Sequence, residues 1–296
     1  MWTHRVGIAS RATPIWESDV KASLFSQSLF ALSLERAIAV TSELGFAAIE
    51  LACWGPHLDL STPHHELETV ALRVKRAGLE VSALSGLNNF TDPSRLEEQL
   101  DTAETLIRLA SVFGTKTVKL TPGPPGSAEA TELHWECFRT ATAKLAELAD
   151  EAGVRLAFET HMGHLTDTLS SSMRVLQMTP ARIIGLTVDF SNMAFVGEDM
   201  REVISCLGNR TYNTHVKNGY IDSDGRYHFL PLDEGLTDYP LVLSMLRDVG
   251  YDGYLSLECL GPDAQENPKQ TARRDLEILR RYLKQLGINP AGRSDR

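Results

Sequence analysis

The chain has 296 residues, of which 43% are hydrophobic and 23% charged, so it can bury a large core and is too apolar for a disordered protein. Its net charge of −10 argues against a nucleic-acid partner, because phosphate backbones are held by clusters of Lys and Arg. No apolar run approaches the roughly 18 residues of a membrane span, and the first residues hold no apolar stretch typical of an export signal.

The cysteines indicate the compartment. Cys53, Cys137, Cys206 and Cys259 lie far apart and form no C-x-x-C pair, so neither a disulfide framework nor a structural zinc site is predicted. We therefore expect a protein of the reducing cytoplasm, with a cytoplasmic location.

Short β-rich runs alternate with longer amphipathic segments along almost the whole chain. The predicted strands are residues 5–10, 46–54, 79–86, 115–123, 154–161, 183–191, 211–218 and 254–260. The predicted helices are residues 33–45, 64–77, 93–113, 129–152, 168–178, 199–207, 239–250 and 268–286. Ser33 is expected to cap the first helix and Gly45 to end it, and Asp238 is expected to cap the helix that starts near Pro240.

Eight strand-then-helix units predict an α/β fold, a (β/α)8 TIM barrel with a parallel eight-stranded barrel. Alternation of this kind requires parallel strands covered by helices, and eight units close a barrel. An open doubly wound sheet is the main alternative, but no G-x-G-x-x-G or G-x-x-x-x-G-K-[ST] motif follows the first strand. The Pro/Gly-rich stretch 121–127 lies within the series, so residues 1–296 are expected to form one domain.

Four successive strands end in a polar residue: Glu159, Asp189, His215 and Glu258. Taken singly, such a residue often caps the following loop or helix. In a barrel, however, all four would meet at the carboxyl ends of the strands, where active sites lie. Three carboxylates in a partly buried site repel one another unless a cation balances them. We therefore predict one divalent metal ion bound by these four residues.

The expected ligand set is mostly oxygen, which favours manganese, with magnesium, cobalt or zinc as alternatives. The segments "ELACW", "FETH", "VDFSN", "HVKN", "DGRYHFLPLDEGLTDYP" and "GYLSLECLG" occur in this order along the chain. In these segments the sequence resembles the xylose isomerase-like TIM barrel superfamily, the sugar phosphate isomerase/epimerase family. The resemblance implies the same four metal ligands, with Glu159 and Glu258 as the catalytic acid and base.

What the resemblance implies is a metal-dependent sugar isomerase or epimerase. A carboxylate would remove a proton next to a carbonyl of a small carbohydrate or polyol-derived substrate, through a metal-stabilised enediolate. The alternative is a lyase or dehydratase that acts on a keto-inositol or keto-glycoside by elimination. Asn192 favours this alternative, because it stands where ketose 3-epimerases have a histidine and an asparagine cannot carry a proton at neutral pH.

Two further classes remain. The related abasic-site endonucleases would need more histidine ligands and a basic face, which the net charge of −10 argues against. A non-enzymatic binding barrel would not require two opposed carboxylates on a metal. Whether the chain forms a homo-oligomer is left open by the sequence.

Candidate substrate-binding residues follow from strand period, because residues two apart share a face. His161 lies two beyond Glu159, and Lys217 two beyond His215. Aromatic residues after the first two predicted strands are expected to stack on a sugar. Each candidate has a structural alternative: a hydrogen-bonded histidine, an ion-paired lysine or a packed tryptophan. The complete set is His161, Lys217, Asn192, Trp16, Trp54, His57 and Lys119.

Overall fold

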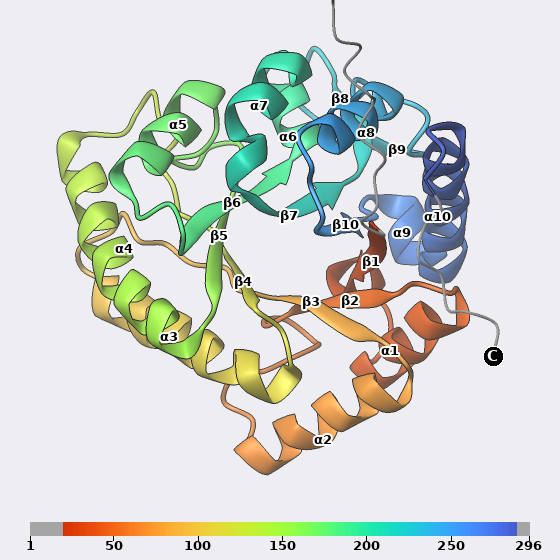
Figure 1. The fold of residues 1–296 in the computed structure, drawn as a ribbon, viewed down its shortest axis with the longest axis horizontal. Helices are drawn as coiled ribbons and strands as arrows, with labels where there is room; N and C mark the ends of the chain where they lie inside the picture. The colour runs from red at the N-terminus through yellow and green to blue at the C-terminus, as the bar shows by residue number, and fades with distance from the viewer. Residues whose placement is uncertain (1–19, 289–296) are drawn as a thin grey trace, which may run out of the picture.

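The computed structural model describes residues 20–288, and eight parallel strands in them close into a barrel. The strand order around the barrel is β1-β10-β7-β6-β5-β4-β3-β2 (Figure 1). Their bounds are β1 (Lys21–Phe25), β2 (Ala48–Ala52), β3 (Glu80–Ser85), β4 (Thr117–Leu120), β5 (Arg155–Glu159), β6 (Ile184–Asp189), β7 (Thr211–Val216) and β10 (Tyr254–Leu257). The predicted TIM barrel is therefore confirmed.

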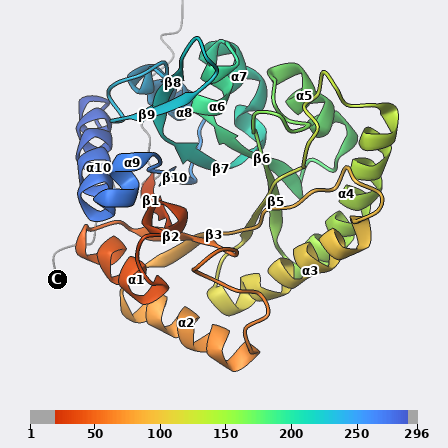
Figure 2. The same cartoon turned by 180° about the vertical axis from the view of Figure 1, so that it is seen from behind.

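Helices surround the barrel, as both views show (Figures 1 and 2). The longer ones are α1 (Leu34–Glu43), α2 (His64–Arg76), α3 (Leu96–Phe113), α4 (Glu132–Ala152), α5 (Leu169–Met178), α7 (Met200–Leu207), α8 (Tyr239–Asp248) and α10 (Pro268–Gln285). Short helical turns not predicted from the sequence are η1 (Ser26–Leu29), α6 (Phe190–Phe195), η2 (Gly208–Arg210) and α9 (Pro262–Glu266). Among residues 20–288, no helix has the length and apolar character needed to cross a membrane.

The predicted helix ends depend on local side chains. Ser33 accepts a hydrogen bond from the backbone N–H of Arg36, and so caps α1, while Gly45 follows that helix with φ of 81°. Asp238 accepts a hydrogen bond from the backbone N–H of Leu241 at the start of α8, where a proline occupies the first turn. These caps are as predicted.

The first barrel strand is not the one predicted. Residues 5–10 lie outside the described residues, and β1 closes the barrel by pairing with both β2 and β10. The sequence of β1, KASLF, is only five residues long, and the strand is defined by its pairing with the strands on either side. Lys21 anchors its start through an ion pair with Glu80, with Nζ 2.7 Å from Oε1.

The insertion between β7 and α8 forms a two-stranded antiparallel hairpin, in a segment where the sequence predicted no element beyond residue 218. Its strands are β8 (Asn218–Ile221) and β9 (Tyr227–Leu230). The Asn218 amide ties the hairpin to the following loop, because its Nδ2 donates to the carbonyls of Leu232 and Thr237, each at 3.0 Å. The hairpin is thus fixed directly beyond the carboxyl end of β7.

Candidate metal centre

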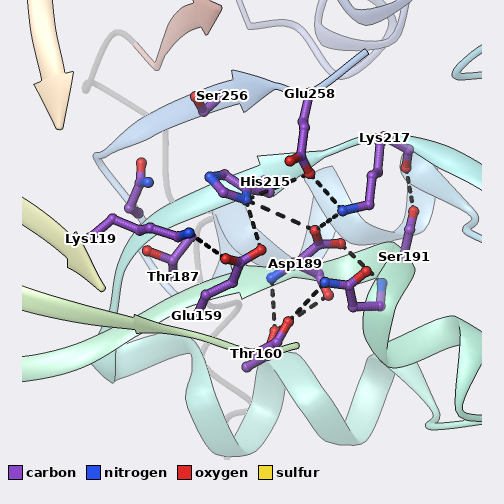
Figure 3. Close-up of polar contacts among 12 residues, drawn as sticks. Lys119, Glu159, Thr160, Thr187, Asp189, Ser191, His215, Lys217, Ser256 and Glu258 are labelled. Atoms are coloured by element: carbon purple, nitrogen blue, oxygen red, sulfur yellow. Dashed lines mark hydrogen bonds and ion pairs between the residues drawn. The ribbon is translucent and has the colours of Figure 1, made fainter. Parts of the chain in front are cut away.

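Glu159, Asp189, His215 and Glu258 come together at the carboxyl ends of β5, β6, β7 and β10 (Figure 3). Each offers one ligand atom, and these four atoms all lie within 4.8 Å of one another. Asp189 and His215 are fully buried, and the two glutamates are no more than 5% exposed. Parallel pairing explains the convergence, since Asp189 lies opposite His215 in the register of β6 and β7.

Two buried lysines pair with these carboxylates. The Lys119 Nζ lies 2.5 Å from Glu159 Oε2, and the Lys217 ammonium contacts Asp189 and lies 2.6 Å from Glu258 Oε2. A fourth buried carboxylate, Glu50 on β2, contacts His215. Four carboxylates against two ammonium groups leave two negative charges uncompensated when the imidazole is neutral. One divalent cation would balance them.

His215 is held between carboxylates on both sides of its ring. Its Nδ1 lies 3.2 Å from Glu159 Oε1 and 3.7 Å from Glu258 Oε2, and its Nε2 lies 2.9 Å from Glu50 Oε1. Burial lowers the pKa of His215, but the charges of Glu50 and Glu159 outweigh it and raise that pKa well above the usual range. Without a metal ion, a proton on His215 therefore supplies part of the missing positive charge.

The neighbouring carboxylates differ in their affinity for a proton. Burial raises the pKa of Glu159, but Lys119 and His215 more than offset it and hold that pKa well below its usual range. Burial raises the pKa of Asp189, Lys217 opposes this, and repulsion from Glu258 adds to the rise. A cation bound beside Asp189 would oppose this rise, because it favours the ionised form of the carboxyl.

The residues present fit a divalent ion. The set offers three carboxylate oxygens and one imidazole nitrogen, the group holds two uncompensated negative charges, and Nδ1 of His215 faces the carboxylates. Oxygen-rich sets of this kind suit Mn²⁺, Mg²⁺ and related ions.

A cavity of about 400 Å³ opens over the centre. Both glutamates line it, whereas Asp189 and His215 lie beneath its surface. Four of the predicted substrate-binding residues line the cavity: His161, Lys217, Asn192 and Lys119. Apolar groups line it too, among them Leu87, Met162, Tyr227, Phe229 and Leu260. The cavity therefore combines a charged region with an apolar wall, the composition typical of small-molecule sites.

Two of these residues show what they can offer a ligand. The His161 Nδ1 lies 2.8 Å from the carbonyl of Met162, which leaves Nε2 for the cavity. Asn192 donates from its backbone to Asp189 and from Nδ2 to Thr160 O, both at 3.0 Å. Its Oδ1 is buried without a hydrogen-bond partner among residues 20–288. A buried acceptor in this position is available to a donor on a ligand.

Trp54 and His57, two of the residues predicted to contact a sugar, lie outside the lining of the cavity. Trp54 packs edge-on to Phe25 and Phe30, and Lys119 Nζ lies 5.7 Å from its ring centroid. His57 places Nε2 3.2 Å from the carbonyl of Leu32. Neither residue lines the cavity, and Trp16 lies outside the described part of the chain.

The aromatic side chains that do reach the cavity are Tyr227 and Phe229, on the hairpin strand β9. Neither residue was predicted from the sequence, although the two stand two apart in "YHFL", the spacing of one strand face. The sequence likewise did not predict His164, whose ring lies 4.5 Å from that of His161, or Glu50. The available signal for Glu50 was a carboxylate inside the apolar strand "AIELA".

A closed barrel of eight parallel strands, covered by helices and with polar side chains gathered at the carboxyl ends of the strands, defines the class of TIM barrels. The model of one family of this class, the xylose isomerase-like TIM barrel, matches residues 38–282. The chain therefore belongs to the xylose isomerase-like TIM barrel family.

Two relatives in sequence are dehydratases. The 3-dehydroshikimate dehydratase of Bacillus anthracis is 25% identical over 261 residues, which cover 80% of this chain and 90% of the relative. An inosose dehydratase of Clostridium perfringens is 25% identical over 179 residues, which cover 56% of this chain and 59% of the relative.

Solved structures share the fold. The IOLI protein with a bound zinc atom has a TM-score of 0.78 at 16% identity, and the match covers 90% of this chain and 99% of that chain. L-Ribulose 3-epimerase has a TM-score of 0.74 at 22% identity, with 90% and 95% covered. A xylose isomerase-like barrel from Mycobacterium smegmatis, in complex with magnesium, has a TM-score of 0.73 at 18% identity, with 90% and 98% covered.

Proposed function

We propose that the protein is a metal-dependent enzyme that removes a proton next to a carbonyl of a carbohydrate- or cyclitol-derived substrate and then eliminates water. The observation that carries the proposal is the meeting of Glu159, Asp189, His215 and Glu258 beneath a cavity that both glutamates line. These four residues would hold the ion, for which manganese is our first choice and magnesium, cobalt or zinc the alternatives. When bound, the ion would hold adjacent substrate oxygens and stabilise the negative charge that develops there.

The two glutamates supply the proton transfers. Figure 3 shows them reaching toward His215 and Asp189 from opposite sides. Glu159, kept ionised by Lys119, accepts the proton from the carbon next to the carbonyl. Glu258, once it has taken up a proton from solvent, gives that proton to the leaving hydroxyl, which departs as water as the carbon–oxygen bond breaks. The Lys217 ammonium beside Glu258 stabilises the carboxylate that remains, and Glu159 releases the abstracted proton to solvent.

The cavity suits a substrate with one polar side and one apolar face. Oxygen atoms of the substrate would meet Lys217, His161 and Asn192 on the charged side. The apolar face of a sugar or cyclitol ring would pack on Tyr227 and Phe229. Contacts on both the polar side and the apolar face would hold the substrate in one orientation relative to the two glutamates, which favours the reaction.

Dehydration is our first choice because the two sequence relatives above are dehydratases, and because Asn192 cannot relay a proton. Isomerisation or epimerisation, which the sequence placed first, is the second candidate. The opposed placement of Glu159 and Glu258 favours it, since a proton removed on one side of the carbon can be returned on the other. Both candidates share the first step.

The test is turnover by manganese-loaded protein of a panel containing 3-dehydroshikimate, an inosose and L-ribulose, followed by mass spectrometry. Dehydration gives a product lighter by one water, whereas isomerisation in ordinary water leaves the mass unchanged and in deuterated water adds deuterium.

We expect Glu159→Gln to slow either reaction by about 10²–10⁴-fold, the usual contribution of a general base. Glu80→Gln is the matched control, because Glu80 pairs with Lys21 at the amino end of the barrel and should leave the rate unchanged. Wild-type turnover by folded, metal-loaded Glu159→Gln protein would contradict the assigned role.

A further inference from the structure

We propose that Glu50 is a positioning residue that keeps the proton of His215 on Nε2 and so presents the Nδ1 lone pair to the metal ion. The inference rests on the proposed metal site and concerns how one of its ligands is prepared. Glu50 lies on β2 and lines no part of the cavity, so its role cannot be contact with substrate.

Glu50 is fully buried and receives four hydrogen bonds. Its Oε1 lies 2.5 Å from the Ser85 hydroxyl and 2.9 Å from His215 Nε2. Its Oε2 accepts from Asn213 Nδ2 at 3.0 Å and from the Ser256 hydroxyl at 2.7 Å. The four donors stand on β3, β7 and β10, so both carboxylate oxygens are held in place from three other strands.

The metal-free ring meets carboxylates at both nitrogens, Glu159 at Nδ1 and Glu50 at Nε2, so a cation bound on the Nδ1 side leaves the ring with its proton beside Glu50. An ionised carboxylate accepts hydrogen bonds and donates none, so the contact with Glu50 requires a hydrogen on His215 Nε2. In the neutral ring, Nδ1 then bears the lone pair. Nδ1 is also the nitrogen that faces Glu159 and Glu258, at 3.2 and 3.7 Å.

The ring plane is fixed as well. Phe25 stacks on the imidazole with a centroid distance of 4.9 Å and an interplanar angle of 25°. Asn213 lies two residues before His215 on β7 and shares its strand face, so one strand supplies both the ligand and a donor that orients Glu50. Rotation of the ring would break the Glu50 contact and leave a buried carboxylate partly unsatisfied.

The first test is the zinc affinity of Glu50→Gln, measured by competition with a chelator. We expect binding weaker by about 10- to 100-fold, the usual cost of removing the partner of a ligating histidine. Glu80→Gln makes the same substitution at the other end of the barrel and should bind zinc like the wild type. Equal affinity of folded Glu50→Gln and wild-type protein would overturn the proposal, as would an equal loss in both variants.

The second test needs no variant, so it decides the matter even if Glu50→Gln fails to fold. Nitrogen-15 NMR of the zinc-loaded wild type distinguishes the two imidazole tautomers, and the signals of His215 can be assigned through its contact with the Phe25 ring. We expect the proton on Nε2 and the metal on Nδ1. A metal-loaded protein with the proton on Nδ1 overturns this inference alone, whereas a wild-type protein that binds no metal overturns the proposed function with it.

Discussion

His164 is a cavity residue whose ionisation the fold alters. Burial and the neighbouring His161 lower the pKa of His164 to about 4, while Glu159 opposes the shift. The His164 Nδ1 is buried without a hydrogen-bond partner in the described part of the chain. In the folded protein the His164 ring therefore stays uncharged until the pH falls toward about 4.

This shift predicts an acid-sensitive contribution to stability. The folded pKa lies below the unfolded value of about 6.5, so between about pH 6.5 and 4 the unfolded chain binds more protons and stability falls as the pH falls. We therefore expect the melting temperature of metal-free His164→Gln protein to fall less than that of the metal-free wild type as the pH is lowered from about 6.5 to 4. His65→Gln, with a side chain 78% exposed, is the control and should follow the wild-type curve. Parallel curves for His164→Gln and the wild type would contradict the prediction.

At the residue scale, sequence pattern and three-dimensional contact contribute differently. Glu159, Asp189, His215 and Glu258 could be chosen from the sequence because each ends an apolar strand and barrel geometry brings strand ends together. Glu50 is marked in the sequence only as a carboxylate inside an apolar strand, and nothing in that strand indicates that its donors come from β3, β7 and β10. Its role appears only when the register of the closed barrel is known.

The hairpin β8–β9 is the element that shapes the cavity beyond the common barrel. It carries Tyr227 and Phe229 to the cavity, and it was missed because its strands are short and the chain there reads as a turn-rich loop. Asn218 and Gly235 lie at its base. Gly235 has φ of +123°, and a Cβ added there would lie 2.5 Å from Asn218 Oδ1 and 2.6 Å from the Gly219 nitrogen.

We therefore expect Gly235→Ala to loosen the hairpin. The added methyl group must displace backbone or the Asn218 amide, in addition to the backbone strain of a non-glycine residue at positive φ. Gly225→Ala, at the hairpin tip with φ of +78° and nothing within 4 Å of the added Cβ, isolates the backbone cost. Limited proteolysis and melting temperature should show a larger effect for Gly235→Ala, and equal effects in both variants would contradict the steric argument.

At the scale of the whole molecule, the alternation of strands and helices was enough to predict the barrel, because eight βα units have few other ways to bury both faces of a parallel sheet. The first strand was placed wrongly, since the five residues of β1 are too few for a decisive periodic signal and are defined by pairing with β2 and β10. The closed barrel gathers four strand ends at a single cavity. That gathering, rather than any single residue, is the basis of the proposed metal centre.

The most direct test of the account is the metal content of the purified protein by elemental analysis, beside a Glu159→Gln, Glu258→Gln double variant whose folding is verified by circular dichroism. We expect about one divalent ion for each wild-type chain and much less in the folded variant. A folded wild-type protein that holds no metal above background, even after manganese is added, would contradict the central claim.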